Sequence, residues 1–229
     1  MSTWVWRDVS SEYRANAIFI DRRLKVNDYQ HRLNAQLSDC VDYIAEQMDG
    51  SSSEHFVIVA HSGGGILAPL VVKRFPQRCA AIMFVCANIP KSGNNSMSEL
   101  PGLIRLINRL AVKRQLRVNS FPAKRMEKNI RKMFCNTCRE DVIEYVLKQD
   151  LLPEPFCVIT EKVDWADMPQ IRMVYVRLLK DKTASLDLQD RMASNLSITE
   201  KYDIDSDHMV MLSHAKEFND VMRRVNSAL

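Results

Sequence analysis

Residues 55–74, HFVIVAHSGGGILAPLVVKR, decide the fold of this chain. A continuous apolar run stops at Ser62, and apolar residues resume after the glycines with helical spacing, so the stretch predicts a strand, a sharp turn and a helix. A turn this tight gives its central residue strained backbone angles and needs small neighbours, which Ala60, Gly63 and Gly64 provide. Ser62 would then stand exposed at the carboxyl end of the strand. This is the nucleophile-elbow pattern G-x-S-x-G, with alanine in place of the first glycine.

Two other structures fit the same pattern, a phosphate-binding glycine-rich loop and a plain strand-to-helix turn. A phosphate loop would continue with lysine and then serine or threonine, and Gly63–Gly65 are followed by Ile66. We therefore favour the nucleophile elbow.

The composition is typical of one globular α/β domain. The 229 residues are 46% hydrophobic and 26% charged, which allows a full core. No stretch approaches the roughly 20 apolar residues of a membrane span, and the N-terminus lacks the pattern of a signal peptide. Of the six cysteines only Cys135 and Cys138 are close in sequence, which is more typical of two helix-end thiols than of a zinc or redox site. We expect a cytoplasmic protein with reduced thiols, no metal and no cofactor.

Positive charge is concentrated between Arg105 and Lys132, although the net charge of the chain is only +4. Ten lysines and arginines stand there against Glu127 alone. A solvated helix surface explains such a run better than recognition of an acidic ligand, and the lack of interleaved aromatic residues argues against nucleic acid. We expect a small-molecule substrate as partner, no nucleic acid and no membrane.

Strands and helices alternate along most of the chain, which predicts an α/β fold with a doubly wound, mainly parallel sheet. Besides the strand before Ser62, we expect strands at 17–21, 79–86, 173–179 and 199–204, and amphipathic helices at 29–48, 187–196 and 215–225. The basic, proline-containing region 90–167 is predicted to be a helical cap. It is inserted between the core segments 1–89 and 168–229 of a single domain, 1–229.

Three residues that follow predicted strands form a candidate catalytic triad: Ser62, Asp181 and His208 come in the order nucleophile, acid, base. The carboxyl ends of parallel strands share one crevice, so the three can meet there. His208 would accept the Ser62 proton, and Asp181 would orient the imidazole. Other candidates for the acid remain open, and His61 is expected to point away from Ser62 into the core. The competing acids are Asp187, Asp203, Asp205 and Asp207.

The chain resembles the α/β-hydrolase superfamily, in particular the branch of plant hydroxynitrile lyases, methylesterases and their bacterial relatives. Besides the elbow, the matching segments are Trp4-Val5-Trp6, Phe134–Cys138, Leu152–Pro155, Tyr175–Asp181 and Asp207–Leu212. In this branch a lysine after the catalytic histidine marks the cyanohydrin-cleaving members. Met209 stands there, so the resemblance implies ester hydrolysis.

The chain departs from the family at its N-terminus. The resemblance implies further strands before Trp4, the last ending in a His-Gly that helps form the oxyanion hole, whereas this chain starts at Met1. Gly63 N–H is then the one oxyanion donor that can be assigned. Three arrangements are open: segments 17–21 and 55–61 pair directly, another chain fills the gap, as in a homodimer, or the chain is an N-terminally shortened form.

We therefore expect a serine hydrolase that cleaves a small carboxylic ester, lactone or thioester through an acyl-enzyme. A catalytically weak or inactive ligand-binding homologue is the alternative. A C–C lyase of the hydroxynitrile-lyase type is less favoured because of Met209.

Overall fold

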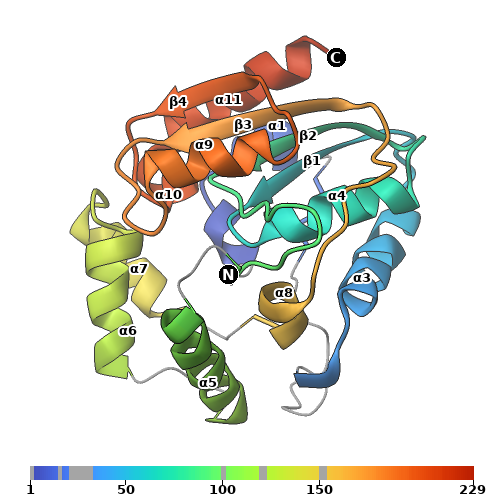
Figure 1. The fold of residues 1–229 in the computed structure, drawn as a ribbon. Coiled ribbons are helices and arrows are strands. Elements are labelled where there is room, and N and C mark those ends of the chain that lie inside the picture. Colours follow the sequence, from blue (N-terminus) through green and yellow to red (C-terminus); the bar gives the residue numbers. More distant parts are fainter. Residues whose placement is uncertain (1–2, 15–16, 21–32, 99–101, 119–122, 150–153) are drawn as a thin grey trace.

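Four parallel strands form the sheet at the centre of the molecule (Figure 1). The computed structural model describes all residues except 1–2, 15–16, 21–32, 99–101, 119–122 and 150–153. Within this part of the chain the strands pair in the order β1-β2-β3-β4, so that consecutive strands are neighbours. This confirms the predicted α/β fold class. The strands are β1 (Phe56–His61), β2 (Cys79–Val85), β3 (Arg172–Leu178) and β4 (Glu200–Ile204).

Helices cover both faces of the sheet, which explains why β2 is an unbroken apolar run. Ile82 and Phe84 belong to the cluster under α3, α4 and α9, whereas Met83 and Val85 belong to the cluster under η1, α10 and α11. The helices packed around the sheet are η1 (Thr3–Trp6), α1 (Ser11–Arg14), α3 (Leu37–Asp49), α4 (Gly64–Arg74), α9 (Leu186–Ser194), α10 (Val210–Ser213) and α11 (Ala215–Ser227).

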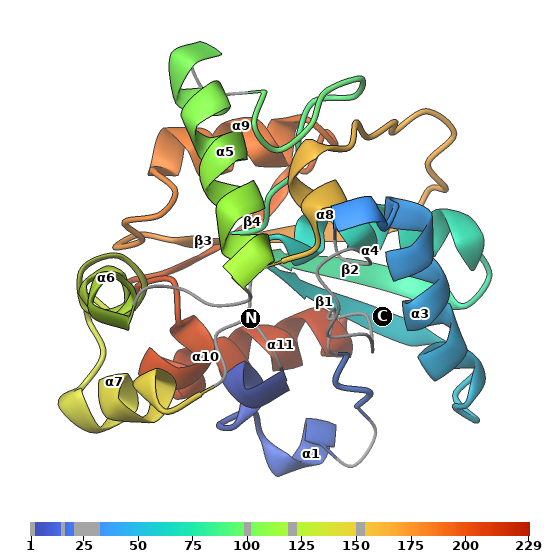
Figure 2. The ribbon, with the colours of Figure 1, turned by 90° about the horizontal axis from the view of Figure 1, so that it is seen from below.

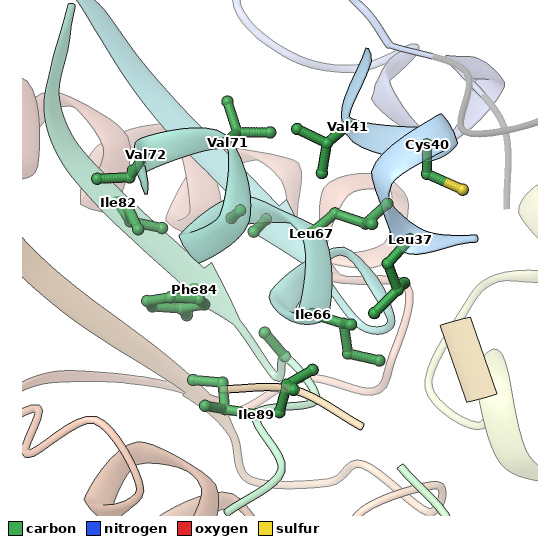
Figure 3. Close-up of a cluster of buried hydrophobic side chains, with 14 of the residues drawn as sticks. Leu37, Cys40, Val41, Ile66, Leu67, Val71, Val72, Ile82, Phe84 and Ile89 are labelled. Atoms are coloured by element: carbon green, nitrogen blue, oxygen red, sulfur yellow. The ribbon is translucent and has the colours of Figure 1, made fainter. Parts of the chain in front are cut away.

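The first cluster fixes the position of α4, and therefore of the turn before it. Figure 3 shows Leu37 and Val41 of α3 meeting Leu67 of α4, with Phe84 of β2 beneath. Full burial of each such side chain stabilises the fold by about 1.5–3 kcal/mol. Within the predicted helix at 29–48, α3 begins at Leu37; Leu33 and Asn34 are helical but separate from it, and residues 29–32 lie outside the described part of the chain.

Among the described residues between β2 and β3, in the region predicted as a cap, there are four α-helices and one π-helical turn. Figures 1 and 2 show α5 and α6 apart from α11, whereas α8 lies beside α4, with Cys157 and Val158 in the same buried cluster as Leu67. No helix in the described part of the chain is long and apolar enough to cross a lipid bilayer. The elements are α5 (Gly102–Val118), α6 (Ala123–Asn129), η2 (Ile130–Phe134), α7 (Glu140–Leu147) and α8 (Phe156–Thr160).

The strand expected at 17–21 is wrong for its described part. Ala17–Ile20 belong to no helix or strand, and Asp21 lies outside the described residues. Both Ala17–Ile20 and β1 line a cavity of about 1090 Å³, so the two segments do not pair directly. An apolar segment becomes a strand only where a neighbouring strand accepts its hydrogen bonds. In the described sheet β1 is therefore an edge strand.

Candidate active site

Ser62 occupies the sharp turn between β1 and α4. Its φ of 54° lies in the left-handed region, which is strained for a residue with a side chain. Three backbone hydrogen bonds hold this conformation. Ser62 N–H donates to Val85 O (3.1 Å), while Ser62 O accepts from Gly65 N (3.1 Å) and Asn88 N (2.8 Å). The ends of β1 and β2 thus fix the serine in place.

The glycine that sterically permits this turn is Gly65. A Cβ on Gly65 would lie 2.7 Å from Asn88 O and 2.8 Å from the Ala87 side chain, which is too close without a backbone shift. A Cβ on Gly64 would make only an ordinary contact, and Gly63 has an ordinary right-handed φ of −60°. The need for a residue without a side chain, which was expected at Gly64, therefore falls on Gly65.

Asp181 lies three residues after β3, with its side chain fully buried. Oδ1 accepts hydrogen bonds from Thr183 N (2.6 Å), the Thr183 hydroxyl (2.7 Å) and Ala184 N (3.1 Å). Oδ2 accepts from the Cys86 thiol (3.1 Å) and lies 2.5 Å from His208 Nδ1. Both carboxylate oxygens are thus fully used.

The ionised form of Asp181 is favoured by this environment. Burial raises the pKa of Asp181. The hydrogen bond and charge of His208, together with the hydrogen bonds from Thr183 and Cys86, lower this pKa by more than burial raises it. The pKa therefore lies well below the usual range of an aspartate. An ionised carboxylate only accepts hydrogen bonds, so the neutral His208 ring carries its proton on Nδ1 and leaves a lone pair on Nε2.

His208 is buried between two aromatic rings. Its ring centroid lies 5.4 Å from that of Phe134, which meets it edge-on, and 4.6 Å from that of His61. Nε2 of His208 is buried and has no hydrogen-bond partner among the described residues. A buried acceptor without a partner costs free energy, which is tolerated where a reacting group is to be bound.

His61 links the serine to the histidine. Its Nε2 lies 2.9 Å from the backbone oxygen of His208, so His61 is a buried, hydrogen-bonded residue as expected. The ring of His61 also contacts the His208 ring. Ser62 itself makes no hydrogen bond to His208 within the described part of the chain. The structure thus joins Asp181 to His208 directly and Ser62 to them through its neighbours.

The competing carboxylates are all directed elsewhere. Asp203 pairs with Arg177 and Asp205 with Lys180, while Asp187 is exposed in the first turn of α9. Asp207 is fully buried, but it accepts from Thr137 N (2.8 Å) and the Ser213 hydroxyl (2.8 Å). Asp207 therefore ties the loop after η2 to the loop that carries His208.

Gly63, the predicted oxyanion donor, precedes the first residue of α4. Its N–H donates no hydrogen bond to any described residue. The free N–H groups at a helix N-terminus carry partial positive charge, which suits a developing oxyanion.

Cys86 and Thr183 are functional candidates that the sequence did not single out. Cys86 follows β2 with a φ of 39°, a second strained residue at the same end of the sheet as Ser62. Its position at the end of β2 and its strained φ make Cys86 a functional candidate, and both are visible only in the structure.

Cys86, Asp181 and His208 offer ligand atoms within 4.8 Å of one another. The three side chains are already hydrogen-bonded to one another, Cys86 Sγ to Asp181 Oδ2 (3.1 Å) and Asp181 Oδ2 to His208 Nδ1 (2.5 Å). We assign no metal to this group.

The sequence of this chain is similar to those of known proteins. The model of the alpha/beta hydrolase family matches residues 3–221. Methylesterase 7 from Arabidopsis thaliana is 47% identical over 45 residues, which cover 20% of this chain and 17% of that protein. Salicylic acid-binding protein 2 from Nicotiana tabacum is 25% identical over 176 residues, 71% of this chain and 66% of that protein. The matches thus span less than two thirds of these relatives.

A solved structure is similar over nearly the whole chain. An extracellular alpha/beta-hydrolase from a Paenibacillus species superposes with a TM-score of 0.80 at 20% identity, covering 97% of this chain and 93% of that one. At this identity the likeness supports the fold alone.

Proposed function

The chain belongs to the alpha/beta hydrolase family, and we propose from this premise that it is a serine hydrolase acting on a small carboxylic ester, lactone or thioester. Ser62 is the proposed nucleophile, His208 the base and Asp181 the orienting acid. Similarity to a methylesterase favours an ester among these substrates.

One observation carries the proposal. Among the described residues the buried Nε2 of His208 has no hydrogen-bond partner, while Nδ1 is bound to an ionised carboxylate 2.5 Å away. This is the state required of a general base, since the lone pair must be on the nitrogen that faces the reacting group. A histidine with a purely structural role would have both nitrogens satisfied.

The reaction follows from these positions. Ser62 Oγ attacks the carbonyl carbon and transfers its proton to His208 Nε2, while Asp181 stabilises the resulting imidazolium. The oxyanion that forms is close to the N-terminus of α4, where Gly63 N–H can donate to it. His208 then returns the proton to the leaving alcohol or thiol. Water repeats the sequence on the acyl-enzyme and releases the carboxylic acid.

We also propose that region 90–167 acts as a cap over this site. Phe134 of η2 contacts the His208 ring, and Thr137 N is bound to Asp207 beside it. The substrate would then be held between this region and the ends of the strands.

A fluorophosphonate probe tests the nucleophile directly, because it reacts covalently with activated serines. We expect the wild-type chain to be labelled and Ser62→Ala to remain unlabelled. Ser52→Ala, which changes an exposed serine outside the turn, is the matched control and should label like the wild type. Equal labelling of wild type and Ser62→Ala, or labelling of neither, would contradict the proposal.

A ligand-binding homologue with little turnover is the second candidate. It is favoured by the absence of a hydrogen bond between Ser62 and His208, two residues that the structure describes. Thermal-shift measurements with small esters and their acids separate the two functions. Stabilisation by an ester that stays uncleaved would support binding, since ligand at 100 times its Kd adds about 2.7 kcal/mol without any chemistry.

A further inference from the structure

Helix α5 turns an apolar face to the solvent. Leu103, Leu106, Ile107 and Leu110 are 72%, 55%, 56% and 61% exposed. Their spacing, i, i+3, i+4 and i+7, places them on one face of the helix. Isolated exposed leucines are ordinary, but four large aliphatic side chains on one helix face form a contiguous patch.

The opposite face of α5 contacts the protein. Arg105, Asn108, Ala111 and Val112 are half-buried there. Arg105 Nη2 donates to Ser98 O (2.9 Å), and Lys113 Nζ lies 5.5 Å from the centre of the Phe156 ring. A surface helix normally turns its large aliphatic side chains toward the core. The outward apolar face therefore has no role in the folded core.

The charge of α5 is of one sign. Its 17 residues include no aspartate or glutamate, and Arg109, Lys113, Arg114 and Arg117 are all exposed. The only acid between Arg105 and Lys132 is Glu127, which pairs with Arg131. A surface that covers the apolar face must therefore also accommodate several positive charges, so it carries negative charge.

We propose that α5 is an interfacial helix that docks this protein on an anionic lipid surface. Its aliphatic side chains enter the boundary of the acyl chains, and its cations contact the headgroups. Interfaces with protein partners are enriched in aromatic residues, whereas this face holds only leucine and isoleucine. Figure 1 shows α5 at the periphery of the molecule, away from the sheet, so it can lie on a flat surface.

This proposal replaces the expectation, drawn from composition, that no membrane is a partner. That expectation rested on the lack of a spanning segment, and none is found among the described helices. A helix that lies in the plane of the interface needs no such segment, since it inserts only one face.

Sedimentation with vesicles tests the proposal without any assay of activity. We expect the wild-type chain to bind phosphatidylcholine vesicles that contain phosphatidylserine and to bind pure phosphatidylcholine vesicles weakly. Binding should fall at high salt, because each cation near an anionic surface contributes roughly fivefold to the partition coefficient.

Two sets of variants assign the binding to α5. L103S/L106S/I107S/L110S should abolish it, and R109Q/R114Q/R117Q should weaken it by roughly a hundredfold. The matched controls are Leu229→Ser, an exposed leucine outside α5, and K148Q/K162Q, which removes exposed lysines elsewhere. Both controls should bind like the wild type. Circular dichroism establishes that the variants remain folded, as expected for changes at exposed positions.

Three outcomes would overturn the proposal. The first is that the wild type binds neither kind of vesicle. The second is that the serine variant binds as well as the wild type. The third is that the wild type is a dimer in solution that this variant dissociates, with no vesicle binding, which would make a second copy the occupant of this face.

Discussion

Phe84 on β2 and Leu106 on α5 are both large apolar side chains in regular elements, yet Phe84 is fully buried whereas Leu106 is 55% exposed. The same contrast holds for charge. Asp181, at the end of β3, is buried and bound on both oxygens, while the cations of α5 lie mostly in solvent. Phe84 and Asp181 thus find their partners inside the protein. Helix α5 leaves its apolar and its charged groups available to something outside the chain.

Substitutions in the sheet and substitutions on the outer face of α5 should therefore have different effects. Changes in the sheet and its site should affect stability and chemistry, because the side chains there are packed or hydrogen-bonded inside the protein. Changes on the outer face of α5 should leave both intact and affect association alone. The predictions below test this division from its strongest consequence to its weakest.

Asp181→Asn should have the largest effect. Asparagine presents an NH₂ group that can donate to His208 Nδ1, which favours the wrong tautomer of the imidazole. We expect the rate of fluorophosphonate labelling to fall by roughly 10³–10⁴. Asp205→Asn is the matched control, because Asp205 forms only a surface pair with Lys180 and should leave the rate unchanged. A similar loss in both variants would mean that Asp181 does not act on the base.

The same variant has a second signature in the pH dependence of stability. The pKa of Asp181 is lowered in the folded state, so its ionised form stabilises the fold above its unfolded pKa of about 3.9. This contribution is lost as the pH falls through the lower folded-state value. We therefore expect chemical denaturation to show a wild-type advantage over Asp181→Asn near neutral pH that shrinks in acid. A constant difference would contradict the lowered pKa.

Phe84→Ala should have the next largest effect, this time on folding. Phe84 is fully buried in the cluster of Figure 3, and its ring stacks 6.5 Å from that of Tyr175. We expect a loss of about 3–5 kcal/mol in the free energy of unfolding, measured in urea. Phe84→Leu keeps most of the volume and should lose less than about 1.5 kcal/mol. Equal losses would show that packing at this position is loose.

Much of the sheet and part of its site could be predicted because local patterns specify them. The apolar run 79–86 is too short for a typical helix and has no polar face, so it predicts a buried strand, which is β2. Asp181 and His208 stand out because each follows a strand, and the structure brings them within 2.5 Å. The strained φ of Ser62 likewise follows from the glycines after it.

Other features depend on contacts between distant segments and could not be predicted. Cys86 and Thr183 bind Asp181, but a thiol at the end of an apolar run cannot be told from a core residue by sequence. Ala17–Ile20 has the composition of a strand, yet a strand also needs a neighbour. The spacing in α5 predicts an apolar face but not the direction in which that face turns.

Asp207→Asn should have a smaller effect than these core changes. Asp207 joins Thr137 after η2 and Ser213 of α10 to the loop of His208, so the variant weakens the tie between the two regions. An amide oxygen can still accept one of these bonds. We expect a loss of about 1–3 kcal/mol in stability. A loss above that of Phe84→Ala would contradict the order proposed here.

Leu106→Ala should have the smallest effect on folding, although it removes as much apolar volume as a costly core substitution would. The cost of such a change comes from lost burial and from the cavity that remains, and an exposed side chain contributes to neither. Alanine is also the slightly better helix former. We expect the free energy of unfolding to change by less than about 0.5 kcal/mol, and the labelling of Ser62 to be unaffected. The matched substitution on the inner face, Val112→Ala, should be more destabilising despite the smaller side chain, because Val112 is half-buried. If Leu106→Ala instead destabilised by more than Val112→Ala, the apolar face of α5 would be packed against the protein itself. The distinction between the self-contained sheet and the outward-facing helix would then fail.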